Sequence, residues 1–179
     1  MCAYMIQGKK VTLRHANIED RLQIFQWLAE SDLTCKMLGP PDFEDNPAPG
    51  WEEFIADYNS DFFDNEDPYH GRSYIIEVGN SPVGHINYNE IYRQNNYVEM
   101  DIWLAGSEFC NKGYGSDAIL TLCNFLQNNL GCHTFVIAPS ARNRDAIRVY
   151  ERCGFEATDE VFKGFVPDYY DTVVMAKVV

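Results

Sequence analysis

The chain has 179 residues, of which 46% are hydrophobic and 14% aromatic; this composition excludes a disordered or collagen-like protein and predicts one globular domain over residues 1–179. Its 14 basic and 27 acidic residues give a formal net charge of -13, which argues against nucleic acid and anionic membrane surfaces as partners. A cationic ligand, such as a small-molecule amine, is electrostatically favoured.

The first third of the chain predicts one strand and two helices. Residues 11–14 have the character of a short strand, and Asn17 is placed to cap a helix. The apolar positions expected to share the buried face of that helix are Ile18, Leu22, Phe25 and Leu28. A second amphipathic helix is predicted from the helical spacing of Trp51, Phe54, Ile55, Tyr58 and Phe62.

An acidic segment overlaps the second helix. No Lys or Arg occurs between Met37 and Gly71, whereas ten carboxylates do: Asp42, Glu44, Asp45, Glu52, Glu53, Asp57, Asp61, Asp64, Glu66 and Asp67. Two interpretations stay open, a wall that holds the amino groups of a ligand and an ordinary solvated helix surface.

The centre of the chain predicts three strands. Residues 73–78 and 83–92 form a hairpin around the turn at 79–82, and a third strand follows at 97–104. Period-two alternation places Glu99, Asp101 and Trp103 on one face of the third strand and apolar residues on the other. One face of this strand therefore presents two carboxylates and an indole ring, or is a solvated face without a function.

The second half of the chain predicts two helices and three strands. A glycine-containing loop at 107–115 leads into a helix at 116–129, whose core side is formed by Ile119, Leu122, Cys123, Leu126 and Leu130. Gly131 is placed to end this helix. A strand at 133–138, a helix at 143–152 and two strands near 160–165 and 172–178 follow.

The six cysteines and four histidines show no metal-binding spacing, since there is no C-x-x-C pair and no H-E-x-x-H motif. No secretory segment follows Met1, and no run of about 18 apolar residues is present. We expect a cytoplasmic protein with reduced thiols, no metal ion and no membrane-spanning helix; the oligomeric state stays open.

The glycine loop predicts an anion site. In residues 111–116 the glycines let backbone N–H groups approach a ligand closely, and a helix amino terminus adds positive potential, which suits a pyrophosphate. Taken alone, a G-x-G before a helix is more often a tight turn. The loop lacks the G-K-[ST] of a P-loop and the third glycine of a dinucleotide-binding fingerprint.

The helix at 143–152 carries the pattern N-x-x-A-x-x-x-Y-x-x-x-G-F in full, as Asn143, Ala146, Tyr150, Gly154 and Phe155. Together with the glycine loop it resembles the acetyl-CoA-binding half of the GNAT superfamily of N-acetyltransferases. The loop departs from that pattern at Cys110, which stands where the family has Gln or Arg. The resemblance implies an α/β fold with a mixed, mostly antiparallel sheet of about seven strands flanked by about four helices.

Within the superfamily the chain is most similar to aminoglycoside 6′-N-acetyltransferases. The similarity lies in V-T-L-R at 11–14, Trp27-Leu28, P-V-G at 82–84 and the loop of 101–116 with Glu108 and Lys112-Gly113. Some of these features also occur in acetyltransferases that act on protein N-termini and on hydroxamate siderophores. These acceptors, polyamines and a non-catalytic acyl-CoA-binding module remain alternatives.

The expected chemistry assigns roles to particular side chains. An ammonium group must lose a proton before acyl transfer, so Asp101 is the first candidate for the base and Glu99 the second. The resemblance implies that Tyr150 protonates the leaving thiolate. Asp168 and Asp171, near the C-terminus, are expected to bind substrate amino groups together with Glu99 and Asp101.

The resemblance also assigns the contacts to the cosubstrate, acetyl-CoA. The backbone of Ile102, Trp103 and Leu104 is expected to pair with the pantetheine arm. Asn143 and Tyr150 belong to the same site. The pyrophosphate would be held by Lys112, Gly113, Tyr114, Gly115 and Ser116. Arg142 or Arg144 either reaches the 3′-phosphate or lies on a solvated helix face.

Overall fold

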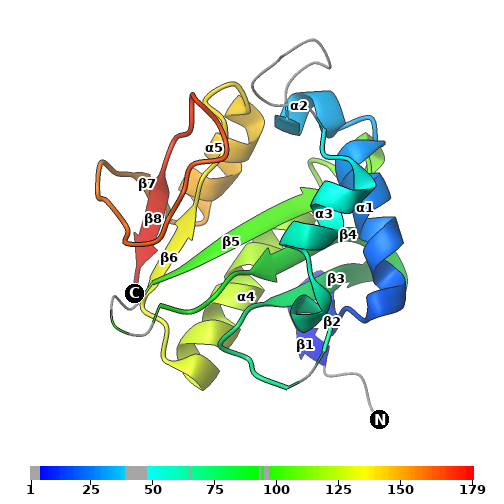
Figure 1. Cartoon of the computed structure of the whole chain (residues 1–179), viewed down its shortest axis with the longest axis horizontal. Helices are drawn as coiled ribbons and strands as arrows, with labels where there is room; N and C mark the ends of the chain where they lie inside the picture. Colours follow the sequence, from blue (N-terminus) through cyan, green and yellow to red (C-terminus); the bar gives the residue numbers. More distant parts are fainter. Residues whose placement is uncertain (1–4, 39–47, 65, 93, 95–96) are drawn as a thin grey trace.

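The computed structural model describes residues 5–38, 48–64, 66–92, 94 and 97–179. These residues form one mixed sheet with the strand order β1-β2-β3-β4-β5-β6-β8-β7 (Figure 1). The strands are β1 (Met5–Gln7), β2 (Thr12–His15), β3 (Arg72–Val78), β4 (Ser81–Tyr88), β5 (Tyr97–Leu104), β6 (Thr134–Ile137), β7 (Glu156–Ala157) and β8 (Met175–Val178). Every pair of neighbouring strands is antiparallel except β5 and β6. The predicted mixed, mostly antiparallel sheet is confirmed.

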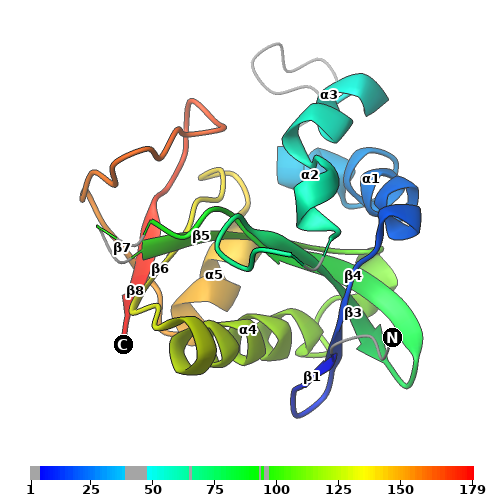
Figure 2. The ribbon, with the colours of Figure 1, turned by 60° about the horizontal axis from the view of Figure 1, so that its bottom comes forward.

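Helices cover both faces of the sheet (Figure 2). One face carries α1 (Arg21–Ala29), α2 (Thr34–Leu38) and α3 (Trp51–Asp57), and the other carries α4 (Tyr114–Leu130) and α5 (Arg144–Arg152). The longest helix, α4, buries Ile119, Leu122 and Leu126 against the sheet and ends at Gly131, as expected. In the described parts of the chain, no helix combines the length and apolar character needed to cross a bilayer.

The predicted buried face of the first helix is confirmed in part, because Phe25 and Leu28 pack against a core cluster whereas Ile18 and Leu22 do not. Asn17 does act as a cap, but of a 3-10 turn at Ile18–Asp20 that precedes α1. Ile18 and Leu22 are 49% and 54% exposed, whereas Ile24 is fully buried. A 3-10 turn has three residues per turn instead of 3.6, so Ile18, which lies in that turn, is out of phase with the residues of α1.

Several other elements differ from the expectation. The strands predicted at 83–92 and 172–178 are shorter, at Ser81–Tyr88 and Met175–Val178, and β1, α2 and β7 were not predicted. The helix that begins at Trp51 ends at Asp57, because Tyr58 leaves the helical conformation and Asn59 caps a separate 3-10 turn. The helix predicted to begin at Ser116 begins at Tyr114. Residues 160–165 are not a strand: Gly164 has a φ of +90°, and a turn closes from Phe165 N to Phe162 O. Burial of Phe162 against Tyr97 favours this turn over extended pairing.

The strands β5 and β6 separate within the sheet. They pair in parallel only where Tyr97, Val98 and Glu99 face residues 134–136. From Met100 to Leu104, β5 keeps its antiparallel partner β4. The edge of β5 that faces away from β4 is therefore available to a ligand beyond Glu99, and Figure 1 shows the two strands diverging there.

Candidate active site

A cavity of about 630 Å³ lies beside the second half of β5. Its walls come from α3, β5, the loop between β6 and α5, and the segment before β8. Four of the lining side chains are carboxylates: Glu53, Asp57, Asp101 and Asp168. Among the described residues that line it there is no Lys or Arg. The cavity therefore concentrates negative charge that no cationic side chain among its described lining residues neutralises.

Two asparagines hold the carboxylates of β5. Asn87 on β4 stands opposite Asp101, and its Nδ2 donates to Asp101 Oδ2 at 3.3 Å and to Asn89 Oδ1 at 2.9 Å. Asn89 Nδ2 in turn donates to Glu99 Oε2 at 3.2 Å. Sequence reasoning missed both asparagines. Their signal was available, because positions 87 and 89 alternate along the predicted hairpin strand in the same way as 99 and 101.

Burial and mutual repulsion change the acidity of this pair. The surroundings desolvate Glu99 and Asp101, and each lies near further negative charge, including that of Asp168. The pKa of Glu99 is raised to about 8 and that of Asp101 to about 6. At neutral pH one carboxyl of the pair therefore retains a proton, while the other is an ionised base with a pKa close to the surrounding pH.

The phenol of Tyr150 reaches the same cavity from α5. Asn143 caps this helix through a hydrogen bond from Ala146 N to Asn143 Oδ1 at 3.3 Å, and Gly154 ends it at a φ of +88°. Tyr150 is 7% exposed and lines the cavity. Burial, with the nearby charge of Asp101 as the next cause, raises the Tyr150 pKa well above its usual value, so the phenol is protonated at neutral pH.

A second cavity of about 290 Å³ adjoins the first along the open edge of β5. Both are lined by Ile102, Trp103, Asn143 and Tyr150. The second continues past Leu104 and Cys110 to Gly115 at the start of α4. An extended arm laid along β5 would thus run from the start of α4 to Tyr150, which fits the pantetheine of a coenzyme A molecule.

The start of α4 has the backbone expected of a phosphate-binding loop. Gly113 has a φ of +80° and is the N-cap, so the N–H groups of Tyr114, Gly115 and Ser116 have no acceptor inside the helix. A β carbon on Gly115 would find only Ile102 Cδ1 within 4 Å, at 3.9 Å. The loop therefore offers donors and open space for a pyrophosphate.

A lysine that sequence reasoning missed completes this loop. Lys10 Nζ donates to the carbonyl of Lys112 at 2.9 Å, and it lies 2.8 Å from the position of a β carbon on Gly113. Asp117 holds the backbone of Lys10 in place through a hydrogen bond from Lys10 N at 2.6 Å. Lys112 Nζ lies 5.9 Å from the centre of the Phe109 ring. Two ammonium groups, those of Lys10 and Lys112, thus lie near the start of α4. Cys110, which stands where the family pattern has Gln or Arg, carries no positive charge.

Some of the remaining predicted residues line the cavity and others do not. Trp103 lines the cavity with an indole that is fixed by a hydrogen bond from its Nε1 to Ile24 O at 3.3 Å and packs on His85. Of the acidic segment, Glu53 and Asp57 line the cavity; Asp42, Glu44 and Asp45 lie outside the described residues. Asp168 lines the cavity, whereas Asp171 pairs with Arg142.

Comparisons with known proteins bear on the family and the fold. The sequence model of the acetyltransferase (GNAT) domain matches residues 10–156. A solved structure of aminoglycoside acetyltransferase AAC(6′)-Ib with ribostamycin and coenzyme A is similar at a TM-score of 0.73, with 21% identity over 95% of this chain and 94% of that one. A spermidine N-acetyltransferase from Vibrio cholerae, solved with CoA and spermine, is similar at a TM-score of 0.71, with 21% identity over 96% of each chain.

Proposed function

Because this chain belongs to the GNAT acetyltransferase family, we propose that it transfers the acetyl group of acetyl-CoA to an amine of a small polycation, preferably the 6′-amine of an aminoglycoside. The observation that carries the acceptor class is the cavity of about 630 Å³ with four carboxylates and, among its described lining residues, no cationic side chain. Its volume lies within the usual range for pockets that bind small molecules. A substrate with several ammonium groups supplies the missing positive charge.

The fit of acetyl-CoA rests on this chain's own residues. Its adjoining cavity follows the unpaired edge of β5, where Ile102, Trp103 and Leu104 offer backbone groups to an extended arm. Gly113 and the first turn of α4 offer N–H donors to the pyrophosphate, with Lys10 and Lys112 close by. Bound there, acetyl-CoA supplies an acetyl group activated as a thioester.

Asp101 removes the proton that the substrate ammonium must lose. Its pKa of about 6 keeps it ionised at neutral pH while leaving it a stronger base than an ordinary aspartate. The hydrogen bond from Asn87 orients the carboxylate toward the cavity. The pKa of Glu99 is higher, at about 8, so Glu99 keeps its proton at neutral pH. The pair of carboxyl groups then carries one negative charge instead of two.

Tyr150 donates a proton to the thiolate that leaves. Its raised pKa makes the phenol a weaker acid than a free tyrosine, but the thiolate is produced beside it in a site shielded from water. Tyr150 lines both cavities, so the donor lies at the junction where acetyl group and amine must meet. Base and acid therefore approach the reacting atoms from β5 and from α5.

Polyamines are the second acceptor class, because the same observation favours them. Carboxylates spread over α3, β5 and the segment before β8 suit a linear amine as well as a substituted ring. One structurally similar protein is a spermidine N-acetyltransferase. Protein N-termini and siderophores, by contrast, carry too little positive charge to explain so many carboxylates.

The test is release of free thiol from acetyl-CoA in the presence of aminoglycosides, polyamines and peptides, each at matched concentration. We expect turnover with kanamycin-type aminoglycosides that bear a free 6′-amine and none with their 6′-hydroxyl analogues. Turnover of spermidine alone would select the polyamine class, and turnover of peptides alone would refute the polycation proposal. Binding of acetyl-CoA without turnover of any amine would indicate a non-catalytic module.

A further inference from the structure

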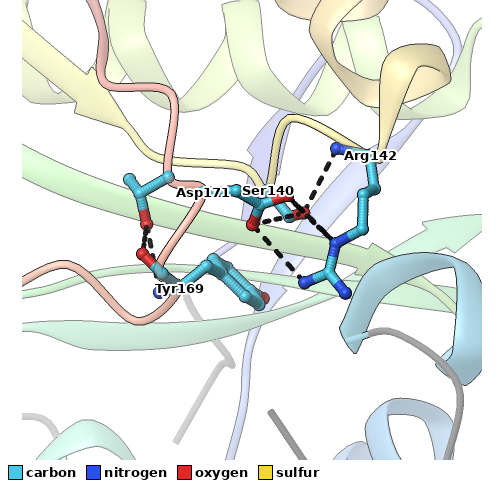
Figure 3. A network of polar contacts seen from close by, with 5 residues as sticks. Ser140, Arg142, Tyr169 and Asp171 are labelled. Carbon is cyan, nitrogen blue, oxygen red and sulfur yellow. Dashed lines mark hydrogen bonds and ion pairs between the residues drawn. The ribbon is translucent and has the colours of Figure 1, made fainter. Parts of the chain in front are cut away.

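Two neighbouring loops that both line the acceptor cavity are joined by a polar network (Figure 3). The carboxylate of Asp171 accepts hydrogen bonds from Ser140 Oγ at 2.9 and 3.0 Å and forms an ion pair with Arg142 Nε at 3.0 Å. Arg142 Nε also donates to Ser140 Oγ at 3.0 Å. We call Ser140, Arg142 and Asp171 the loop clasp. It connects the loop between β6 and α5 with the segment before β8.

The backbones of the two loops are paired at the same place. Ala141 N donates to Asp171 O at 2.9 Å, and Val173 N donates to Pro139 O at 2.8 Å. Ser140 is only 2% exposed, and the side chain of Asp171 is 16% exposed. The side chain of Arg142 is 30% exposed, so the bond between Ser140 and Asp171 is the shielded part of the network and the ion pair lies at its outer side. A charge-assisted hydrogen bond shielded from water holds geometry better than an exposed ion pair.

A tight turn links the clasp to the cavity wall. Thr172 Oγ1 accepts from Tyr169 N at 3.0 Å and donates to Tyr169 O at 2.7 Å. The backbone N–H of Thr172 donates to the same carbonyl at 3.2 Å. Asp168 and Tyr169 line the cavity at the far end of this turn. A change at Asp171 is therefore transmitted to Asp168 through a short, internally bonded segment.

The two neighbouring aspartates have opposite surroundings. Asp171 is neutralised by the guanidinium of Arg142, so little of its charge remains for a ligand. Asp168 instead lines the cavity together with Asp57, and its pKa is raised by burial and by the charge of that carboxylate. One carboxylate is engaged by the protein, and the other lines the cavity.

We propose that Arg142 and Asp171 are positioning residues that fix Asp168 and Tyr169 over the acceptor relative to Tyr150. This inference rests on the proposed function, since it needs a cationic acceptor in the cavity. Asp171 then acts on the acceptor through its partner loop and not as a direct ligand. Arg142 is occupied by the clasp and takes no part in binding the cosubstrate phosphate.

Steady-state kinetics of Asp171→Asn and Arg142→Ala test the proposal, with thermal unfolding as a check on folding. Each single variant should raise the acceptor KM by about 10-fold and change kcat by less than about 3-fold. The KM for acetyl-CoA should stay within about 2-fold. Arg142→Lys, which keeps the charge but loses the planar fork, should fall between wild type and Arg142→Ala. Asp159→Asn makes the same charge change in the exposed loop after β7 and serves as the control.

The double variant decides between positioning and direct binding. If the two residues act as one unit, Arg142→Ala combined with Asp171→Asn should have an acceptor KM no higher than the worse single variant. If Asp171 binds the acceptor itself, Arg142→Ala would free its carboxylate, leaving the KM unchanged or lowered, and the proposal would be overturned. Equal losses with every acceptor and with acetyl-CoA would also overturn it.

Amide hydrogen exchange separates failure of the clasp from failure of the proposed function. In Asp171→Asn the amides of Ala141 and Val173 should exchange faster than in wild type, while those of α4 should not. This result does not depend on which acceptor is used. Unchanged exchange at both amides would refute the clasp even if the wild-type enzyme acetylates aminoglycosides. Wild-type inactivity toward all amines would refute the proposed function instead.

Discussion

Replacing Asp101 with asparagine should make the protein more stable and nearly inactive at the same time. The carboxylate of Asp101 is desolvated and lies near Asp168, and its pKa is raised from 3.8 to about 6. Asparagine removes the charge but keeps an oxygen that accepts the hydrogen bond from Asn87 Nδ2. The carboxylate that we propose as the catalytic base thus lowers the stability of the fold that holds it.

The size of the effect follows from the pKa shift. One pKa unit corresponds to about 1.4 kcal/mol, so the shift sets an upper limit of about 3 kcal/mol on what the charged carboxylate costs at neutral pH. Asparagine is itself polar and half-buried, which reduces the gain to about 1–2 kcal/mol. For a domain of this length, we expect the melting temperature to rise by about 2–8 °C.

The stability difference between Asp101→Asn and wild type should depend on pH. Above the folded pKa of about 6, wild-type Asp101 is ionised and the variant has its full advantage. As the pH falls toward 3.8, the folded wild-type protein takes up its proton before the unfolded chain does, and the penalty is relieved. Thermal unfolding at a series of pH values should therefore show a stability advantage that disappears at about pH 4.

The control for this measurement is Asp171→Asn, which makes the same chemical change at a carboxylate that is paired with Arg142. It should lower stability by about 1 kcal/mol, because it removes a half-buried ion pair and weakens the bonds from Ser140.

The kcat of Asp101→Asn should fall by about 10²-fold or more in the thiol-release assay. An Asp101→Asn protein that is less stable than wild type at neutral pH would refute the electrostatic reasoning, and unchanged kcat would remove Asp101 as the base.

Four further outcomes are expected. Tyr150→Phe should lower kcat by about 10²-fold while calorimetry shows acetyl-CoA affinity within about 3-fold of wild type; unchanged kcat where chemistry limits the rate would exclude the phenol as the acid. Gly113→Val should weaken acetyl-CoA binding strongly, because a β-branched residue resists the φ of +80° and its β carbon would meet Lys10 Nζ. Lys10→Ala should weaken the same binding by a few-fold whereas Lys9→Ala should not, and equal affinities would remove Lys10 from the phosphate loop. Raising ionic strength from about 0.02 to about 0.5 M should lower acceptor kcat/KM, because salt screens exposed carboxylates, and no salt dependence would contradict electrostatic recognition.

Local patterns in the sequence determined the elements that carry the chemistry. Alternation along residues 97–104 was enough to place Glu99 and Asp101 on one face of β5, because successive side chains of a strand point to opposite sides, and Asp101 lines the cavity. The cap at Asn143 and the end at Gly131 were equally readable, since they depend on hydrogen bonds within a few residues. Ile18 does not share the buried face of α1 because it lies in a separate 3-10 turn.

The tertiary structure alone decided which residues from distant segments meet. The hydrogen bond from Asn87 to Asp101 depends on the register between β4 and β5, and Lys10 reaches Lys112 across 102 positions of sequence. Asp168 and Asp171 look alike in sequence, yet one lines the cavity and the other is neutralised by Arg142. Periodicity states which side chains share a face of one element, whereas their partners depend on how separate elements pack, and that packing is a property of the whole chain.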